Sequence, residues 1–314
     1  MTSLVYHAGA LGDFLTALPA LAAWRRLRAG AGEVVLLGRP AHAALAAGLV
    51  DGAWDAGSAR FASLFAGRPT PEVPAFIADV GSALVFAPEG AGIVRGLEIA
   101  GVRGIVRHDP FPKEQVHVVD YHLSLFPDLA LTPDERVPHI AAGAGGATVA
   151  SGAAVAHEAA GADGATRPVV IHPGSGSRSK NWPIGRFIEV AERLEGGSPI
   201  AWVIGPAEEE SGTAAAIARA IPTAPVWRNL PLPVLAERLA SARLFVGNDS
   251  GVAHLAAAVG CAVLVLFGAS DPVVWAPRGR TVTVVGDGAC GMEAIGVEEV
   301  LAACRAILAI SRRP

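Results

Sequence analysis

The stretch over residues 243–271, RLFVGNDSGVAHLAAAVGCAVLVLFGASD, constrains the fold more than any other part of the chain. It predicts a strand over 244–246 that Gly247 ends, a helix that Ser250 caps, and a second strand over 262–267. Two parallel strands joined by a helix form a βαβ unit, in which the helix begins beside the carboxyl end of the first strand. The sequence therefore predicts an α/β fold with a parallel sheet.

The start of that helix is a candidate phosphate site. The backbone N–H groups of Ser250, Gly251 and Val252, with the positive end of the helix dipole, can bind an anion. His254 lies one turn further on and can reach the same ligand. The alternative is an ordinary capped helix with a histidine in the core.

The beginning of the chain repeats this strand-to-helix pattern. A strand over 4–6 is followed by a Gly-rich loop that leads to Asp13 and then by a helix to about Arg28. A carboxylate at this corner can face a ligand. It can also be a helix N-cap, which is worth about 1 kcal/mol.

The second half of the chain starts in the same way, with a strand over 168–171 and the loop HPGSGSRSKNWP over 172–183. The loop lacks both GxxxxGK[ST] and GxGxxG, so it is neither a P-loop nor a dinucleotide fingerprint. Its hydroxyls, exposed backbone N–H groups and compact ammonium still suit phosphate. The residues that offer them are Gly174, Ser175, Gly176, Ser177 and Lys180.

Glu208 follows the next predicted strand, over 200–204, at its carboxyl end. An acidic residue in this position can bind ribose hydroxyls. It can also simply complement the dipole of the helix that follows, and three consecutive glutamates make that reading plausible.

Short strands and helices alternate through the rest of the chain, which is typical of a parallel sheet. The expected strands are 34–37, 76–80, 83–86, 104–106, 226–227 and an edge strand over 281–285, and later helices are expected over 232–239 and 297–310. The Ala/Gly-rich stretch over 141–166 reads as a linker. We therefore expect two domains, 1–160 and 161–314.

Composition excludes several classes of protein. The net charge is −4, which argues against a nucleic-acid partner. The three cysteines form no CxxC pair, which is typical of reduced thiols in a cytoplasmic protein. No uninterrupted apolar run reaches about 20 residues, so no membrane span is expected. The group His117, Asp120 and His122 matches no structural zinc spacing.

Four motifs together resemble glycosyltransferase family 9, the ADP-heptose:lipopolysaccharide heptosyltransferases. They occur in the family's order. They are Gly12-Asp13 with Leu18-Pro19-Ala20-Leu21; His172-Pro173-Gly174-Ser175-Gly176 with Lys180-Asn181-Trp182-Pro183; Gly205-Pro206-Ala207-Glu208; and Asn248-Asp249-Ser250-Gly251 with His254-Leu255-Ala256-Ala257-Ala258 and Phe267-Gly268.

The resemblance implies a GT-B architecture, in which two Rossmann-like doubly wound domains face each other across a cleft. The donor nucleotide would lie on the second domain and the acceptor on the first. The last helix, about 297–312, can pack back on the first domain in such folds. Within the weakly matching region only scattered arginines could meet an anionic acceptor: Arg60, Arg68, Arg95, Arg103 and Arg107.

The resemblance also implies an inverting transfer without metal or cofactor. Asp13 would accept the proton of the acceptor hydroxyl. Charge on the leaving phosphate would meet Lys180, a hydroxyl near Ser175 and the helix end at Ser250 and Gly251. The remaining nucleotide-sugar contacts would come from Gly12, Gly174, Gly176, Glu208 for the ribose, and Asp249 with His254 for the phosphate corner.

The expected partners are a nucleoside diphosphate sugar, with ADP-heptose as the family expectation, and a glycan or glycolipid acceptor. A cytoplasmic location follows, with peripheral contact at the inner membrane face. Two alternatives stay open. A sugar-nucleotide epimerase of similar fold would isomerise instead of transferring, and a non-catalytic binding protein would hold the donor without releasing diphosphate.

Overall fold

The computed structural model describes residues 1–66, 75–140, 167–195 and 197–310. The chain divides into two compact domains between residues 140 and 141. The expected linker over 141–166 and the expected boundary at residue 160 lie outside the described residues. Each domain is an α/β unit built on a parallel sheet, as the alternation of short apolar runs predicts.

The first domain has a five-stranded sheet in the order β3-β2-β1-β4-β5, and every neighbouring pair is parallel. Strand β1 lies in the middle, and the chain reverses its direction of growth between β1 and β4. The strands are β1 Thr2–His7, β2 Val34–Gly38, β3 Gly52–Asp55, β4 Val80–Phe86 and β5 Gly104–His108.

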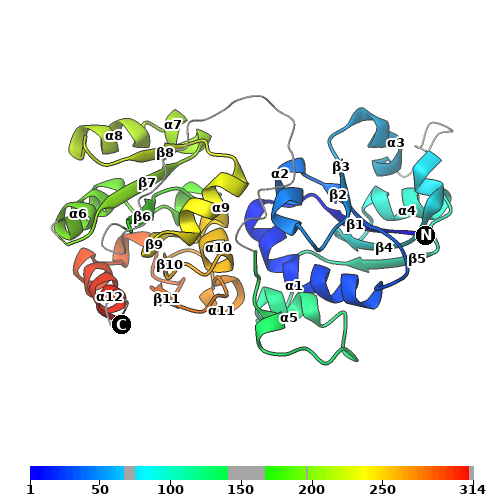
Figure 1. Ribbon diagram of the computed structural model, residues 1–314. Helices are drawn as coiled ribbons and strands as arrows, with labels where there is room; N and C mark the ends of the chain where they lie inside the picture. The colour runs from blue at the N-terminus through cyan, green and yellow to red at the C-terminus, as the bar shows by residue number, and fades with distance from the viewer. Residues whose placement is uncertain (67–74, 141–166, 196, 311–314) are drawn as a thin grey trace. The chain divides into compact units, whose positions relative to one another are not determined.

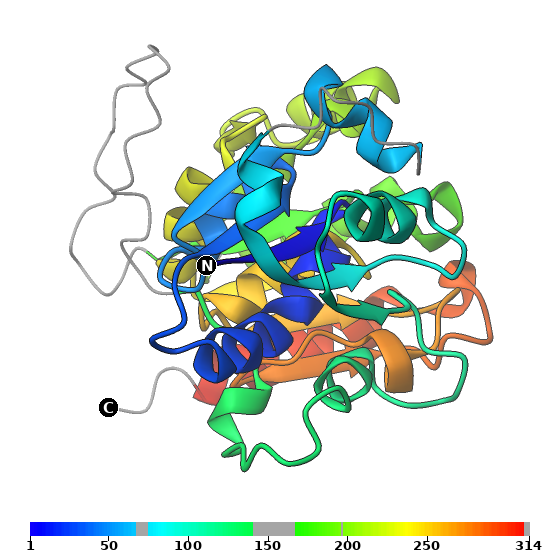
Figure 2. The same cartoon turned by 90° about the vertical axis from the view of Figure 1, so that its right-hand side faces the viewer.

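Helices cover both faces of this sheet (Figures 1 and 2). They are α1 Leu11–Leu27, α2 Pro40–Ala43, α3 Ala62–Phe65, α4 Gly92–Ile99 and α5 Val118–Leu123. One core lies under α3 and α4, where Leu4 and Val85 meet Leu97. The neighbours of Leu4 and Val85 along their strands point to the opposite face, since side chains alternate along a strand.

The second domain has a six-stranded parallel sheet in the order β11-β10-β9-β6-β7-β8. Here the chain grows from β6 through β7 to β8 and then returns to β9 on the other side of β6. The strands are β6 Val169–His172, β7 Ile200–Ile204, β8 Val226–Arg228, β9 Leu244–Asn248, β10 Val263–Leu266 and β11 Val282–Val285.

The core of the second domain joins one face of this sheet to α6, α8 and α12. Its helices are α6 Ile184–Glu195, α7 Pro206–Glu210, α8 Thr213–Ala220, α9 Leu232–Ala240, α10 Gly251–Ala258, α11 Pro272–Trp275 and α12 Val297–Ile310. The apolar face of α12 supplies Val300, Leu301, Cys304 and Ile307 to this core. The last helix therefore contributes to the core of its own domain, and its expected return to the first domain stays a prediction.

Two local expectations are wrong. Residues 76–80 do not form a strand: a 3₁₀ helix occupies Ala75–Asp79, and β4 begins only at Val80. Strand β9 does not end at Gly247 but continues to Asn248. The strand passes so close to β6 that a Cβ at Gly247 would lie 2.8 Å from the carbonyl oxygen of His172, so the glycine permits pairing here and does not break the strand.

Among the described helices, none combines the length and the apolar composition needed to cross a bilayer.

Candidate functional site

The polar residues of the second domain gather at the carboxyl edge of its sheet. The segments that follow β6, β7, β9 and β10 carry Lys180, Glu208, Asp249 and Ser270 respectively. These four strands are neighbours, and the direction of chain growth reverses between β6 and β9. In open parallel sheets the crevice at such a reversal point is where ligands bind.

Lys180 and Asp249 form an ion pair at this reversal point. The Nζ of Lys180 lies 2.6 Å from Oδ2 of Asp249, although the two residues are 69 positions apart. The carboxylate side chain is only 8% exposed while the lysine side chain is 33% exposed. An ammonium has three N–H groups, so a partly exposed lysine with one donor held by Asp249 can direct the others to a ligand.

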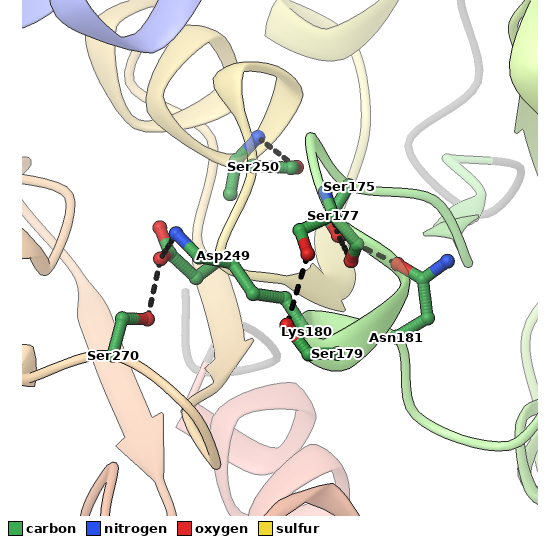
Figure 3. A network of polar contacts seen from close by, with 9 residues as sticks. Ser175, Ser177, Ser179, Lys180, Asn181, Asp249, Ser250 and Ser270 are labelled. Carbon is green, nitrogen blue, oxygen red and sulfur yellow. Dashed lines mark hydrogen bonds and ion pairs between the residues drawn. The ribbon is translucent and has the colours of Figure 1, made fainter.

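Figure 3 shows this pair with its surroundings, including Ser270, whose Oγ lies on the same carboxylate. The hydroxyl donates to Oδ2 of Asp249 at 2.6 Å. One oxygen thus accepts two donors. Neither the Lys180–Asp249 contact nor the Ser270–Asp249 hydrogen bond was predicted from the sequence.

Asn248 holds the loop after β6 against β9. This fully buried amide donates to the carbonyl oxygen of Pro173 at 2.8 Å and accepts from the backbone N–H of Trp182 at 3.1 Å. The indole of Trp182 is buried as well and donates to the carbonyl oxygen of Ile295. Both ends of the loop are therefore fixed before any ligand binds, which is the arrangement that lowers the ordering cost of binding.

The hydroxyl of Ser175 forms hydrogen bonds with other residues of the same loop. Its Oγ lies 2.6 Å from Oδ1 of Asn181 and 2.7 Å from the carbonyl oxygen of Ser177. The Oγ atoms of Ser177 and Ser179 are 2.9 Å apart. Gly176 lies at the exposed tip with open space around it.

A pocket of about 440 Å³ opens between this loop and the start of α7. Its lining is polar, with Ser175, Gly176, Arg178 and Asn181 on one side and Glu208, Ser211 and Thr213 on the other. Its volume is within the range for small-molecule sites.

Glu208 lines this pocket and is largely buried, at 7% exposure. Its Oε2 accepts a hydrogen bond from the backbone N–H of Gly205 at 2.8 Å. The carboxylate therefore stabilises the first turn of α7, in line with the alternative that Glu208 serves the helix that it begins. Gly174 packs against the same carboxylate: a Cβ there would lie 2.0 Å from Oε1.

His172 lies buried next to Glu208. Its Nδ1 donates to the carbonyl oxygen of Val203 at 3.0 Å, because a carbonyl oxygen can only accept. Burial lowers the pKa of His172, while the charge of Glu208 partly offsets this effect. The imidazole ring is therefore neutral at pH 7 and lies beside the carboxylate of Glu208.

Helix α10 begins as predicted. The Oγ of Ser250 accepts from the backbone N–H of Ala253, so Ser250 is the N-cap, and Gly251 is the first helical residue. His254 is 7% exposed and lies within the helix. Its proposed contact with a phosphate stays a prediction.

Asp13 is the third residue of helix α1 in the first domain. The N-cap of this helix is Ala10, so Asp13 is not the N-cap. Its Oδ2 accepts from the backbone N–H of Ala10 at 3.1 Å. Gly9 gives the carboxylate room, since a Cβ there would lie 3.1 Å from Oδ2 of Asp13 and 3.0 Å from Cε1 of His7. The preceding Gly12 is the second residue of the helix.

Buried histidines crowd the carboxyl edge of this first sheet, a feature that the sequence did not reveal. His7 and His108 end β1 and β5, and His42 and His122 come from α2 and α5. Burial is the main reason why the pKa of His7 and His122 falls to about 3 and that of His42 and His108 to about 4. The rings are therefore neutral at pH 7, and Nε2 of His108 lies 3.1 Å from Nδ1 of His122.

The arginines considered for an anionic acceptor are scattered. Arg107 lies near the carboxyl end of β5 and donates to the carbonyl oxygen of Ala87 at 3.1 Å. Arg103 precedes β5, at the amino edge of the sheet, where parallel sheets do not bind their ligands. Arg68 lies outside the described residues.

Residues 1–66, 75–140, 167–195 and 197–310 contain no group of three or more His, Cys, Asp or Glu side chains arranged to hold a metal ion. His117 instead accepts a hydrogen bond from the backbone N–H of Val119 at the start of α5.

The family model and the curated relatives agree on one family. Residues 95–296 match the model of glycosyltransferase family 9 (heptosyltransferase). Lipopolysaccharide heptosyltransferase 3 of Escherichia coli is 34% identical over 113 residues, which cover 35% of this chain and 33% of that protein. The chain thus matches about a third of the length of this curated relative.

Solved structures show the same fold. The ADP-heptose LPS heptosyltransferase II of Escherichia coli has a TM-score of 0.74 at 16% identity and covers 100% of both chains. A family 9 glycosyltransferase from Veillonella parvula has a TM-score of 0.75 at 18% identity, over 98% of this chain and 97% of that one. The predicted GT-B class, with two parallel-sheet α/β domains, is confirmed. With a family match that covers most of its length, the chain belongs to glycosyltransferase family 9.

Proposed function

We propose that the protein transfers a sugar from a nucleoside diphosphate donor to a hydroxyl of a glycan acceptor. The observation that carries the proposal is the Lys180–Asp249 pair, which lies at the β6/β9 reversal point next to the capped start of α10. A partly exposed ammonium and a helix N-terminus at one edge together favour a multiply charged anion.

The chemistry of the donor gives these groups their role. As the bond to the sugar breaks, negative charge grows on the leaving diphosphate. Lys180 and the backbone N–H groups at Ser250 and Gly251 would stabilise that charge, and such fixed donors lower the barrier because they need no reorganisation. These groups supply positive charge from the chain itself, and we propose that no metal ion is required.

The nucleoside would occupy the polar pocket between the loop after β6 and α7. Glu208 has one oxygen on the backbone of Gly205, which fixes its orientation, and lies in the lining of the pocket. Ribose hydroxyls are the natural partners of a carboxylate held in this way.

Asp13 would act as the general base. Its carboxylate lies in the first turn of α1, just after β1, at the carboxyl edge of the first sheet. Open parallel sheets bind their ligands at this edge. The hydrogen bond from the backbone N–H of Ala10 to its Oδ2 orients the carboxylate, and each oxygen of an ionised carboxylate can accept more than one hydrogen bond. Displacement of the diphosphate by that hydroxyl from the opposite side of the sugar would invert the anomeric centre.

The names of the relatives suggest the substrates. Lipopolysaccharide heptosyltransferases are among the proteins that this chain matches, and ADP-heptose is named for one structural neighbour. We therefore propose an ADP-heptose donor and a lipopolysaccharide-type acceptor. A cytoplasmic location with peripheral contact at the inner membrane would suit a glycolipid acceptor.

The test is a transfer assay with ADP-heptose and a panel of other nucleotide sugars, with truncated lipopolysaccharide as the acceptor. Sugar on the acceptor together with free nucleoside diphosphate would support the proposal. An isomerised donor without transfer would point to an epimerase. Tight donor binding without diphosphate release, with every acceptor tried, would point to a binding protein.

A further inference from the structure

Ser270 occupies a position at the anion site that the proposed function does not explain. It follows β10, the strand next to β9, and its Oγ donates to Oδ2 of Asp249 at 2.6 Å. Lys180 donates to the same oxygen at 2.6 Å. Figure 3 shows Asp249 with both donors at its carboxylate.

This double contact restricts the carboxylate. Asp249 is almost completely buried, and a buried carboxylate requires hydrogen-bond donors to offset its loss of hydration. A single ion pair would leave the carboxylate free to rotate with the flexible lysine. The serine hydroxyl supplies a second fixed direction, so that Oδ2 keeps facing the ammonium.

The backbone around Ser270 is itself held in place. Gly288, with a φ of +80°, packs so closely that a Cβ there would lie 2.1 Å from the carbonyl oxygen of Ser270. The next residue, Asp271, caps α11 through a 2.8 Å bond from the backbone N–H of Val273 to its Oδ1. The hydroxyl is thus presented from a constrained segment.

We propose that Ser270 is a positioning residue, which aligns Asp249 so that Asp249 holds the Lys180 ammonium at the site of the diphosphate. The proposal rests on the proposed binding of a nucleoside diphosphate at this edge. It predicts that Ser270 affects the diphosphate and not the nucleoside, because Lys180 is the group through which it acts.

The experiment measures binding by calorimetry for wild type, Ser270→Ala and Ser270→Thr. The ligands are ADP, UDP and GDP, and then the nucleoside that corresponds to the tightest of them. Ser270→Ala should weaken diphosphate binding about three- to tenfold, the effect of one hydrogen bond, and leave nucleoside binding unchanged. Ser270→Thr keeps the hydroxyl and should restore most of the affinity.

Ser241→Ala is the matched control, because its exposed hydroxyl donates to the carbonyl oxygen of Arg238 near the end of α9. It should bind every ligand as the wild type does. In a Lys180→Ala background, Ser270→Ala should have no further effect, since residues that act as one unit are not additive.

Three results would overturn the inference alone: unchanged diphosphate affinity in Ser270→Ala, an equal loss for nucleoside and diphosphate, or additive losses in the double variant. A wild-type protein that binds none of the diphosphates would overturn the proposed function and this inference with it.

Discussion

Gly174 and Glu208 pack so closely that a single methyl group between them would collide with the carboxylate. The Cβ of an alanine at position 174 would lie 2.0 Å from Oε1 and 2.4 Å from Cδ of Glu208. The loop after β6 and the helix after β7 can meet in this way only because residue 174 has no side chain. The absence of a side chain at position 174 therefore allows the Glu208 carboxylate to take its place in the lining of the pocket.

Gly174→Ala should displace Glu208 and weaken nucleoside diphosphate binding by about tenfold, roughly the loss of one hydrogen bond to a charged group. Calorimetry with the nucleotide that binds best would measure this. Gly185→Ala is the control, since Gly185 lies in the first turn of α6 with open space around it. Equal affinities for wild type and Gly174→Ala would show that Glu208 does not contact the ligand.

Asp13→Asn should keep donor binding and lower kcat by about two to four orders of magnitude, the usual contribution of a general base. The amide oxygen of asparagine can still accept the hydrogen bond from Ala10, so the start of α1 should survive. Measuring kcat together with the donor Kd separates the two roles. A near-normal kcat in the folded variant would reduce Asp13 to a residue that stabilises its helix.

Stability should fall as the pH is lowered below about 6.5. The pKa of His42 is lowered to about 4 and that of His7 to about 3 in the folded protein, mainly by burial. Unfolded histidines have pKa values near 6.5, so between these limits the unfolded chain binds more protons and gains free energy relative to the folded one. Each such histidine contributes at most about 1.4 kcal/mol per pH unit.

Urea unfolding between pH 7.5 and pH 5 would measure this slope. His42→Phe should reduce it and keep the packing, because the His42 ring is stacked on Phe14 with centroids 4.8 Å apart. The same substitution at the exposed His139 is the surface control for His42→Phe. A free energy of unfolding that does not change with pH in this range would contradict the buried neutral state of these rings.

The strand-to-helix corners that carry the candidate site residues could be predicted from the sequence because each combines a strand, a glycine and a polar residue within a few positions. This signal placed Asp13, Lys180, Glu208 and Ser250 after strands β1, β6, β7 and β9, where the structure has them; their roles stay predictions. It located the strands less well where composition is ambiguous: β3, Gly52–Asp55, was missed because it is short and lies at the sheet edge.

The contacts within the site could not be predicted in the same way. The pairing of Lys180 with Asp249 depends on the adjacency of β6 and β9, which is set by the strand order and not by any local pattern. Ser270 is an ordinary serine in sequence and acquires its role only because β10 lies next to β9. The buried histidines likewise come from four separate segments.

Transfer activity should survive exhaustive chelation of divalent metal. The positive charge at the proposed diphosphate site comes from Lys180 and the start of α10, which chelators do not remove. The assay compares initial rates before and after treatment with excess chelator. Loss of activity that magnesium or manganese restores would show that the chain depends on a metal ion after all.

Lys180→Ala should weaken nucleoside diphosphate binding by about 1.5–3 kcal/mol, the range for a hydrogen bond to a charged group. It should lower kcat further, since the charge that Lys180 meets grows in the transition state. Lys180→Arg should not restore full activity, because a planar guanidinium cannot reproduce the compact contact with Oδ2 of Asp249.

Lys180→Ala should also lower the free energy of unfolding. It leaves the Asp249 carboxylate, whose side chain is only 8% exposed, without its cation. Lys113→Ala, which removes the only other lysine of the chain from an exposed position, is the matched control for calorimetry and for unfolding. If Lys180→Ala loses stability but binds the diphosphate as tightly as the wild type, Lys180 serves only to neutralise Asp249, and the anion site must be sought elsewhere along this edge.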